Sequence, residues 1–455
     1  MFIGNFAGGG AWLRALGIMA GISLAIGAAR AAATPLTLED AWRLAEAANS
    51  TLRAAQAGLS AAEGQLRDAS GLFYNNPTLS TDQTSRRTNP NGQPENRFHE
   101  QAIGIFQTFE IAGQAGFRRS AAEQDLAATR MMLEETRRQV RAEVEQRFAR
   151  VLVLERRIDA ERDAVAAVEE AASAVRRRMA AGEDSRLDSN LATVEAERGR
   201  NQLAALTEQL LQAREELAAI LQLPADNVPV VAGELNAGAP TYTLDALLVS
   251  AAKRSQLQAL EHREEAAHRR LDLENASVVP DVTLGLSVGQ DAPYDSREQF
   301  TRLTLSVPLP LFRRNAAGIG KAATELSQAQ IERESTIRNI NAQVRTLWQR
   351  LDSLRERVKR LTESVYPALD ENRRLSTTAY RAGEIGLLQL LLVNRQLLDA
   401  RRDYLDAVGE FVQTRIALEQ AAGWHADLTE KTNDSNPSFG HSPGARSCTC
   451  RLQQT

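Results

Sequence analysis

The stretch that decides the fold is YRAGEIGLLQL, from Tyr380 to Leu390. Its first glycine interrupts sequence that otherwise favours helix, and a leucine-rich helical segment begins again at once. The stretch RMAAGEDSRLD, from Arg178 to Asp188, repeats this design about two hundred residues earlier. Glycine readily adopts the left-handed conformation that ends a helix. The chain is therefore predicted to make two tight helical reversals, at Gly182 and at Gly383.

Long helices with a coiled-coil seam are predicted on both sides of the reversals. Their apolar residues recur at spacings of three, four or seven, which is typical of helices packed at a shallow angle. Before the first reversal the seam consists of Leu126, Leu133, Val140, Val144, Phe148, Val151, Leu154, Ile158, Val165, Val168, Ala172, Val175 and Met179. It continues in the return helix with Leu187, Leu191, Val194, Leu203, Leu206, Leu210 and Leu217. Before the second reversal it consists of Val344, Leu347, Leu351, Leu354, Val358, Leu361 and Val365.

The rest of the chain also reads as a duplication. Thr37 and Thr243 are each placed to cap a helix that has an acid in its first turn. Each helix is followed by two strand-like segments with alternating polarity. These segments are 78–84 and 100–111 in the first copy, and 281–288 and 300–309 in the second. The predicted fold is mainly α with a small β part, in two tandem repeats, 34–235 and 236–424. Each repeat is predicted to contain a helix, a β-hairpin and a long α-hairpin.

The two ends of the chain differ from this middle. Residues 1–33 resemble an export signal, with Arg14 before an apolar run and small residues after it. The alternative is a single membrane anchor, although the run is short for a span. Residues 425–455 are polar and are predicted to be a disordered tail, which carries the only cysteines, Cys448 and Cys450. No disulfide framework is therefore expected in the fold. The net charge of −4 gives no reason to expect a nucleic-acid partner.

The four strand segments raise the question of a membrane. Each is about ten residues long, which is enough to cross an outer membrane at a tilt. Four strands do not close a barrel, and open sheet edges are not tolerated in lipid. Three chains would supply twelve strands, which is a feasible closed barrel. The alternative is a small soluble sheet that caps the helices.

In this order and at these spacings, the motifs resemble the TolC-type outer-membrane efflux family, from about Leu36 to Trp424. The residues that carry the resemblance are Leu38–Ala41, Asn76–Pro77, Gln107–Ile111, Val307–Asn315 and Tyr380–Gly383. The run Val307–Asn315 (VPLPLFRRN) is most similar to the cobalt–zinc–cadmium resistance branch of that family. Ala112–Gly116 (AGQAG) departs from the Gly-Lys-Arg-like run that is usual in this branch.

The resemblance implies a non-enzymatic channel in the outer membrane of a Gram-negative bacterium. The implied assembly is a homotrimer with a twelve-stranded barrel in outer-membrane lipid and a helical tunnel in the periplasm. The implied partners are a periplasmic adaptor protein and an inner-membrane resistance-nodulation-division pump, and the implied cargo is a heavy-metal cation. Three alternatives stay open: a channel for organic drugs or other small molecules, a periplasmic adaptor, and a coiled-coil scaffold without a pore.

The resemblance also points to particular residues at the two reversals. Family members close the periplasmic entrance with acids six positions after the turn glycine, which here are Asp188 and, in the second copy, Gln389. Tyr380 matches a family position that bonds to an acid of the neighbouring hairpin, so an Asp188–Tyr380 contact is expected at the gate. The adaptor-docking tips are expected at Gly182, Leu187, Gly383 and Leu388. Neither a cofactor nor a metal site is expected, because the five histidines are scattered and no catalytic constellation is present.

Overall fold

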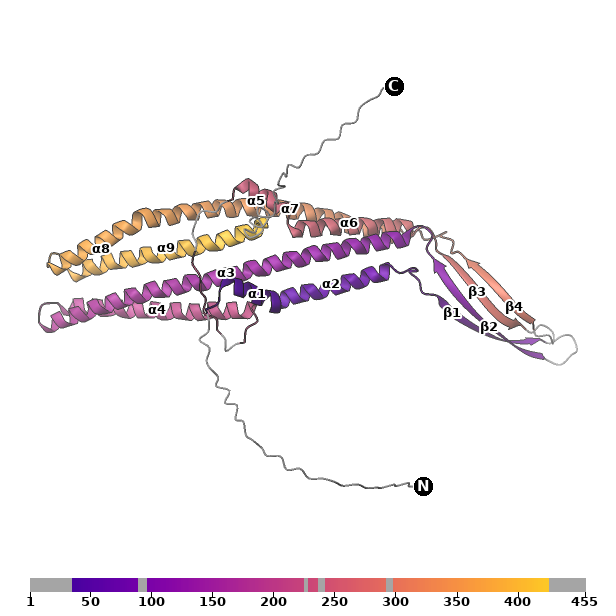
Figure 1. Cartoon of the computed structure of the whole chain (residues 1–455), viewed down its shortest axis with the longest axis horizontal. Coiled ribbons are helices and arrows are strands. Elements are labelled where there is room, and N and C mark those ends of the chain that lie inside the picture. Colours follow the sequence, from indigo (N-terminus) through magenta and orange to yellow (C-terminus); the bar gives the residue numbers. More distant parts are fainter. Residues whose placement is uncertain (1–34, 89–95, 225–227, 236–241, 292–297, 425–455) are drawn as a thin grey trace, which may run out of the picture.

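A computed structural model describes residues 35–88, 96–224, 228–235, 242–291 and 298–424. The signal segment and the tail expected from the sequence lie outside these residues. The first half of the chain contains helices α1 (Leu38–Ala48) and α2 (Ser50–Ala69), strands β1 (Thr78–Thr88) and β2 (Asn96–Phe109), and helices α3 (Gln114–Ala180) and α4 (Arg186–Ile220). Figure 1 shows that α3 runs from the sheet to the far end of the molecule, where α4 turns back beside it.

The second half follows the same plan. It contains α5 (Leu244–Ala251), α6 (Ser255–Ala276), β3 (Val282–Asp291), β4 (Glu298–Ser306), α7 (Ala316–Arg360), a π-helical turn η1 (Leu361–Val365), α8 (Tyr366–Arg381) and α9 (Leu387–Ala422). The predicted threonine caps are confirmed, because Thr37 and Thr243 accept hydrogen bonds from the amides of Asp40 and Ala246. The predicted order of helical segment, β-hairpin and long α-hairpin is therefore present in both copies. The single first helix that was predicted is wrong in each, because the non-helical residues Asn49 and Arg254 divide it into two helices, and η1 interrupts the second long hairpin.

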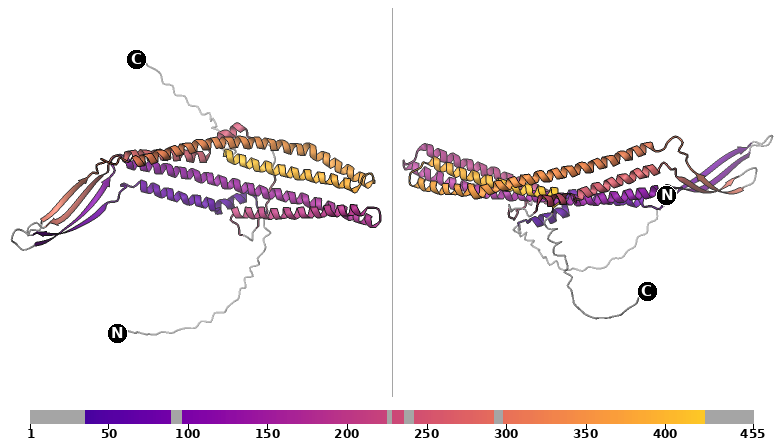
Figure 2. Two further views of the ribbon diagram at one scale, coloured as in Figure 1. Left: turned by 180° about the vertical axis from the view of Figure 1, so that it is seen from behind. Right: turned by 90° about the horizontal axis from the view of Figure 1, so that it is seen from above.

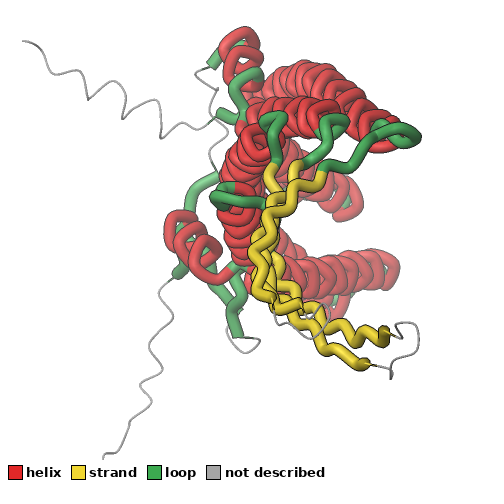
Figure 3. Tube along the Cα trace, turned by 90° about the vertical axis from the view of Figure 1, so that its right-hand side faces the viewer, coloured by secondary structure: helices red, strands yellow, loops and turns green. Residues whose placement is uncertain are grey.

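The molecule is a rod with helices along most of its length and a sheet at one end. Both helical hairpins turn at the end opposite the sheet (Figures 1 and 2). Viewed along the long axis, the helices form an open arc rather than a closed bundle (Figure 3). Helix α3 contacts α2, α4, α6 and α9, so it is the central support of the arc. None of the described helices is both long and apolar enough to span a membrane.

The four strands form one antiparallel sheet in the order β1-β2-β3-β4. Its register places Thr78, Phe106, Gly285 and Thr304 in one row across the sheet. The prediction that the last strand reaches Leu309 is wrong, because β4 ends at Ser306. The physical reason is the sequence Val307–Pro308–Leu309–Pro310, in which neither proline has an amide hydrogen to donate to a ladder. The expected end of β2 at Ile111 is likewise two residues too far.

The coiled-coil seam is correct in the middle of the rod and along α3 up to Ala172 and Val175 near its tip, but it is wrong at the start of α4 and at η1. Val144, Val151, Leu217 and Val344 are fully buried, as predicted. Leu187 and Val194, however, are largely exposed, and the buried face of α4 near the tip is made by Ala192 and Ala196 instead. Small residues allow the helices to approach closely there, so Leu187 and Val194 are turned outward. The predicted seam residue Val365 is also exposed, because the π-helical turn η1 shifts the phase of the helix.

A buried ionic cluster fixes the middle of the rod. Glu135 of α3 is 0% exposed and lies between Arg138 and Arg254, whose side chains are also almost fully buried. Arg138 donates to the carbonyl of Gln420 at 2.8 Å, and Arg254 donates to the carbonyl of Ala421 at 2.9 Å. The two guanidinium groups therefore satisfy the last carbonyls of α9, where the helix dipole is negative.

Candidate functional site

The two glycine reversals have the same backbone geometry. Gly182 has φ +81° and Gly383 has φ +76°. At the first turn the amide of Gly182 donates to Met179, and the amide of Glu183 donates to Arg178. The second turn repeats this pattern with Gly383 on Tyr380 and Glu384 on Ala379. Both are Schellman turns, and the predicted left-handed glycines are confirmed.

The predicted docking leucines point away from the core. Leu187 is 67% exposed and Leu388 is 66% exposed, whereas the adjacent Leu387 is buried. Leu387 belongs to a small apolar cluster with Val175 and Ala192 that joins the two hairpins at their tips. Leu187 and Leu388 therefore lie exposed next to turns whose position is fixed by this buried cluster. Gln389 is exposed beside them, and its backbone amide donates to the carbonyl of Gly386.

Asp188 performs a local structural task in this chain. Its amide donates to the Ser185 hydroxyl at 3.1 Å, and that hydroxyl donates to the Asp188 carboxylate at 2.7 Å. This reciprocal arrangement is close to a capping box at the start of α4. The carboxylate also lies in the first turn of the helix, where the dipole favours negative charge. Any role of Asp188 at an entrance would be additional to this cap.

Arg178 connects the two hairpins, and the sequence analysis did not single it out. Its guanidinium forms ion pairs with Glu183 at 3.4 Å and Asp184 at 3.2 Å, both in the first turn. It also donates to the hydroxyl of Tyr380 in α8 at 3.4 Å, and it lies 5.7 Å from the centre of the tyrosine ring. Arg178 is the last of three consecutive arginines before the turn glycine. This run of arginines could have indicated the contact, because basic side chains in the last turn of a helix can reach polar groups in the reversal that follows it.

Tyr380 is the partner that the second hairpin supplies. Its ring packs against the apolar cluster at the tip. Partial burial raises the pKa of Tyr380, Arg178 opposes this increase, and Asp184 and Asp188 add to it. Asp188 is thus close enough to act on the charge of Tyr380. Among the described residues, however, the recorded hydrogen bond of the Tyr380 hydroxyl is to Arg178. The direct Asp188–Tyr380 contact stays a prediction.

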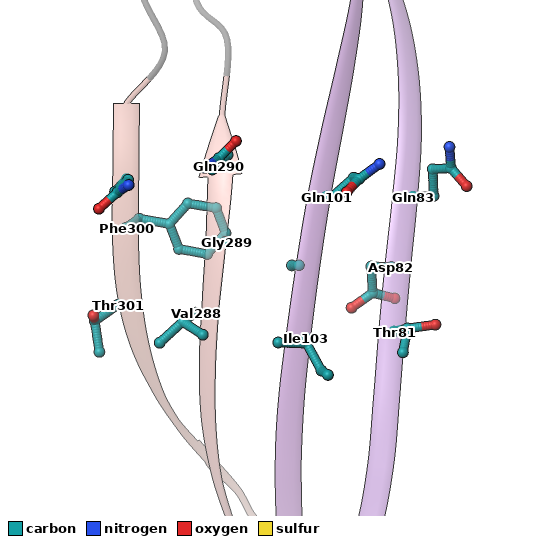
Figure 4. Close-up of a pocket in the computed structure, with 12 residues that line it drawn as sticks. Thr81, Asp82, Gln83, Gln101, Ile103, Val288, Gly289, Gln290, Phe300 and Thr301 are labelled. Atoms are coloured by element: carbon teal, nitrogen blue, oxygen red, sulfur yellow. The ribbon is translucent and has the colours of Figure 1, made fainter.

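The sheet at the other end has two different faces. One row across the four strands consists of Leu79, Ile105, Leu286 and Leu303, all of which are exposed. The opposite face is mostly polar or small, apart from the aromatic residues Phe106 and Phe300, and on it Thr84 pairs with Glu100 and Asp291 pairs with Glu298. Figure 4 shows Phe300 lying across Gly289 on this second face. A Cβ at Gly289 would lie 2.6 Å from that ring, so the glycine makes room for it.

The described residues include no group of three or more His, Cys, Asp or Glu side chains that could hold a metal ion. His262 hydrogen-bonds to Gln124 at 2.8 Å, and His268 lies 3.2 Å from Asp272 within one helix. The tail residues His441, Cys448 and Cys450 lie outside the described part of the chain.

Two helical hairpins, a four-stranded sheet with one apolar face and an arc-shaped cross-section occur together here. A family model described as "Outer membrane efflux protein" matches residues 41–222 and 248–424. The chain belongs to the outer membrane efflux protein family. This is a family of channels, so the adaptor alternative loses its support.

Relatives of this outer membrane efflux protein include two curated proteins. The cobalt-zinc-cadmium resistance protein CzcC of Cupriavidus metallidurans is 28% identical over 397 residues, which are 87% of this chain and 91% of CzcC. The pyoverdine export outer membrane protein OpmQ of Pseudomonas putida is 27% identical over 248 residues, which are 50% of each protein.

Solved structures of outer-membrane channels have the same fold as this outer membrane efflux protein. The structure of VceC from Vibrio cholerae matches with a TM-score of 0.72 at 19% identity, over 85% of this chain and 96% of VceC. The structure of CusC matches with a TM-score of 0.71 at 17% identity, over 85% of this chain and 92% of CusC. At these identities the likeness is one of fold.

Proposed function

We propose that this protein is the outer-membrane channel of a tripartite efflux system that passes divalent heavy-metal cations from the periplasm to the exterior. The observation that carries the proposal is the similarity to CzcC, which extends over 87% of the chain. The cargo is of the cobalt, zinc or cadmium type. The channel performs no chemistry on it, and an inner-membrane resistance-nodulation-division pump drives transport through a periplasmic adaptor.

The assembled state that we propose is a homotrimer. β1 and β4 are the edges of the sheet, so among the described residues each has a partner strand on its inner side and none on its outer side. The exposed leucine row is suited to lipid, and an open edge in lipid would leave backbone groups unpaired. Three chains placed edge to edge would supply twelve strands and close the barrel. The open arc of helices would then become one third of a tunnel wall.

The hairpin tips are the proposed periplasmic entrance. We assign the gate to Asp188, Tyr380 and Gln389, to which the structure adds Arg178 as the group that ties Tyr380 to the first hairpin. Three copies of Asp188 around a threefold axis would attract cations. We assign adaptor docking to the turns at Gly182 and Gly383 with the exposed leucines Leu187 and Leu388. A cysteine in place of Glu384 should crosslink to the adaptor, and a cysteine in place of Leu211 is the distant control.

A second candidate cargo has its own support. OpmQ is a pyoverdine exporter, and it matches half of this chain at nearly the same identity as CzcC. A channel for organic molecules would use the same fold and the same entrance. The two candidates differ in the cargo that accumulates when the channel is missing.

The deciding experiment is a deletion strain challenged with cobalt, zinc, cadmium, nickel, copper and silver, and in parallel with organic drugs and dyes. The proposal expects sensitivity to divalent metals, raised cellular metal, and rescue by the intact gene. Sensitivity to organic compounds alone would overturn the metal assignment and favour the second candidate.

A further inference from the structure

The segment that connects β4 to α7 exposes apolar side chains. Every residue from Val307 to Arg314 is exposed. Phe312 is 97% exposed, Leu309 is 74% exposed and Leu311 is 69% exposed. A hydrogen bond of 2.8 Å from the amide of Leu311 to the carbonyl of Leu309 makes a tight turn that fixes their relative directions. The chain thus presents three large apolar side chains that its own fold does not cover.

A second exposed apolar segment lies at the other edge of the sheet, between α2 and β1. Leu72 is 88% exposed, and Phe73 and Tyr74 are about half exposed. The ring of Phe73 packs edge-on against Phe109 at 5.4 Å between centres. The guanidinium of Arg118 lies 3.5 Å from the centre of the Tyr74 ring. Each aromatic ring is therefore held on one side and free on the other.

The two segments lie at the same level of the rod. The row Thr78–Phe106–Gly285–Thr304 crosses the sheet near its helical end. One segment precedes Thr78 by a few residues, and the other follows Thr304 by a few residues. β1 leads away from the helices and β4 returns toward them, so the two edge strands are antiparallel to each other (Figure 1). The strand order of the sheet can therefore continue from β4 of one copy to β1 of the next.

We propose that Leu309, Leu311 and Phe312 of one copy pack against Leu72, Phe73 and Tyr74 of the next copy. This seam closes the ring of subunits just below the sheet, and it rests on the trimer of the proposed function. The contact is heterologous, because each copy uses one segment toward each neighbour. A rotation that pairs β4 with β1 brings these segments together, so the strand pairing and the seam form in one step.

The geometry favours a second copy over lipid as the occupant. The two apolar segments adjoin the two edge strands, one before β1 and one after β4, which are the places that a neighbouring copy would occupy. A head-to-tail ring requires this pattern, because each unpaired edge must match the opposite edge of an identical copy. The aromatic rings on the β1 side are also already fixed, which lowers the entropy cost of forming a contact.

The test is a disulfide scan of the full-length protein in outer-membrane vesicles. Cys448→Ser and Cys450→Ser remove the only native cysteines. Cysteines at Leu309, Leu311 or Phe312 are then paired with cysteines at Leu72, Phe73 or Tyr74 and oxidised. We expect disulfide-linked dimers and trimers for at least one of the nine pairs. The matched control, Phe312→Cys with Leu211→Cys, also pairs two exposed apolar positions and should give none.

The oligomeric state is measured separately, by amine crosslinking of the same vesicles. A trimer in which none of the nine pairs forms a disulfide would overturn the seam and leave the proposed function intact. The absence of a trimer would overturn both. A nitroxide on Phe312→Cys that dissolved oxygen reaches freely within an intact trimer would show lipid contact instead, and would also overturn the seam.

Discussion

At the scale of single residues, the tip of the rod depends on one arginine that serves both hairpins. Arg178 forms ion pairs with Glu183 and Asp184 of its own hairpin and donates a hydrogen bond to the hydroxyl of Tyr380. Because the arginine is partly exposed, each contact contributes modestly to stability. Its importance lies in position, since it joins hairpins that are about two hundred residues apart in sequence.

Arg178→Ala should loosen the entrance without disturbing the rod. We expect a higher single-channel conductance in planar bilayers and greater leakage of large antibiotics into cells. Arg176→Ala, which removes a neighbouring exposed arginine, is the matched control and should behave as the parent protein. Tyr380→Phe removes only the hydroxyl, so its effect should not add to that of Arg178→Ala. Fully additive effects would contradict the contact between them.

Glu135 is the residue on which the middle of the rod depends. Burial opposes its ionisation, but Arg138 and Arg254 outweigh this and lower the pKa of Glu135 below its usual 4.5. Glu135→Gln leaves two buried guanidinium groups without their anion, which should cost roughly 3–5 kcal/mol. A thermal melt of the detergent-solubilised protein, followed by circular dichroism, would measure the loss. Glu134→Gln, on the exposed neighbour, should change the melting temperature little.

The lowered pKa of Glu135 also predicts how the stability of the fold changes at acid pH. A carboxylate whose pKa is lower in the folded state stabilises the fold above its unfolded pKa, and the contribution fades as pH falls through the folded value. Stability should therefore decline below about pH 4.5. This part of the decline should be absent in Glu135→Gln. If the two proteins had parallel pH profiles in this range, the ionic cluster would not be its source.

At the scale of elements, each helical reversal depends on one left-handed glycine. Gly383 has φ +76°, whereas Gly386 in the same turn has φ −79°, and both face open space. Gly383→Ala should destabilise the hairpin tip by about 1–2 kcal/mol, because a Cβ is strained in the left-handed region. Gly386→Ala introduces no left-handed strain and should cost less, through the weaker preference for Ala at the N-cap of α9 alone. Hydrogen exchange of the α8–α9 turn compares the two, and equal protection would contradict the argument.

The π-helical turn η1 distinguishes the second hairpin from the first. Pro367 has no amide hydrogen for the carbonyl of Glu363, and the amide of Tyr366 reaches back five residues to Leu361. No residue of η1 or α8 is buried, whereas α3 is continuous at the same stage of its hairpin. The outer part of the second hairpin is therefore held mainly by its tip contacts and by α9.

Pro367→Ala should convert η1 into ordinary α-helix. The new amide would supply the missing donor and remove a penalty of about 3 kcal/mol. Hydrogen exchange from Leu361 to Ala368 should slow by at least tenfold, while exchange in α3 stays unchanged. If the protection of η1 amides against hydrogen exchange did not rise, the proline would not be the cause of the π-turn.

The sequence predicted the elements well because helical periodicity and the glycine turns are local signals. The two hairpins, the duplicated order and the threonine caps could all be read directly. The end of β4 and the turn η1 were missed although Pro308 and Pro367 are local signals for them, because the periodicity alone was followed. The end of β2 and the outward Leu187 and Val194 of α4 could not be read, because they depend on how neighbouring elements pack. At the candidate site, the glycines and Tyr380 were found from motifs. Arg178 was missed because its partners lie in two turns that only the fold brings together.

At the scale of the whole molecule, the two faces of the sheet are expected to face two different environments. Leu303→Arg would place a charge on the apolar face, at a cost of up to about 4 kcal/mol in a bilayer. Thr304→Arg, on the adjacent position and the opposite face, should be tolerated, since Arg302 already occupies that face. The measurement is the amount of folded protein in the outer membrane. Equal amounts of the two variants would contradict the assignment of the faces.

The unbroken length of α3 also constrains how this protein can change. Its 67 residues span about 100 Å, so it works as a ruler between the sheet and the hairpin tips. An insertion of one heptad in α3 would move its tip by about 10 Å. To keep both turns level, the same length would have to enter α4, the α7–α8 helix and α9. We therefore expect the exposed faces of the helices to tolerate substitutions, and the helices to change length only in matched sets of four, adjusted to the width of the compartment that they cross.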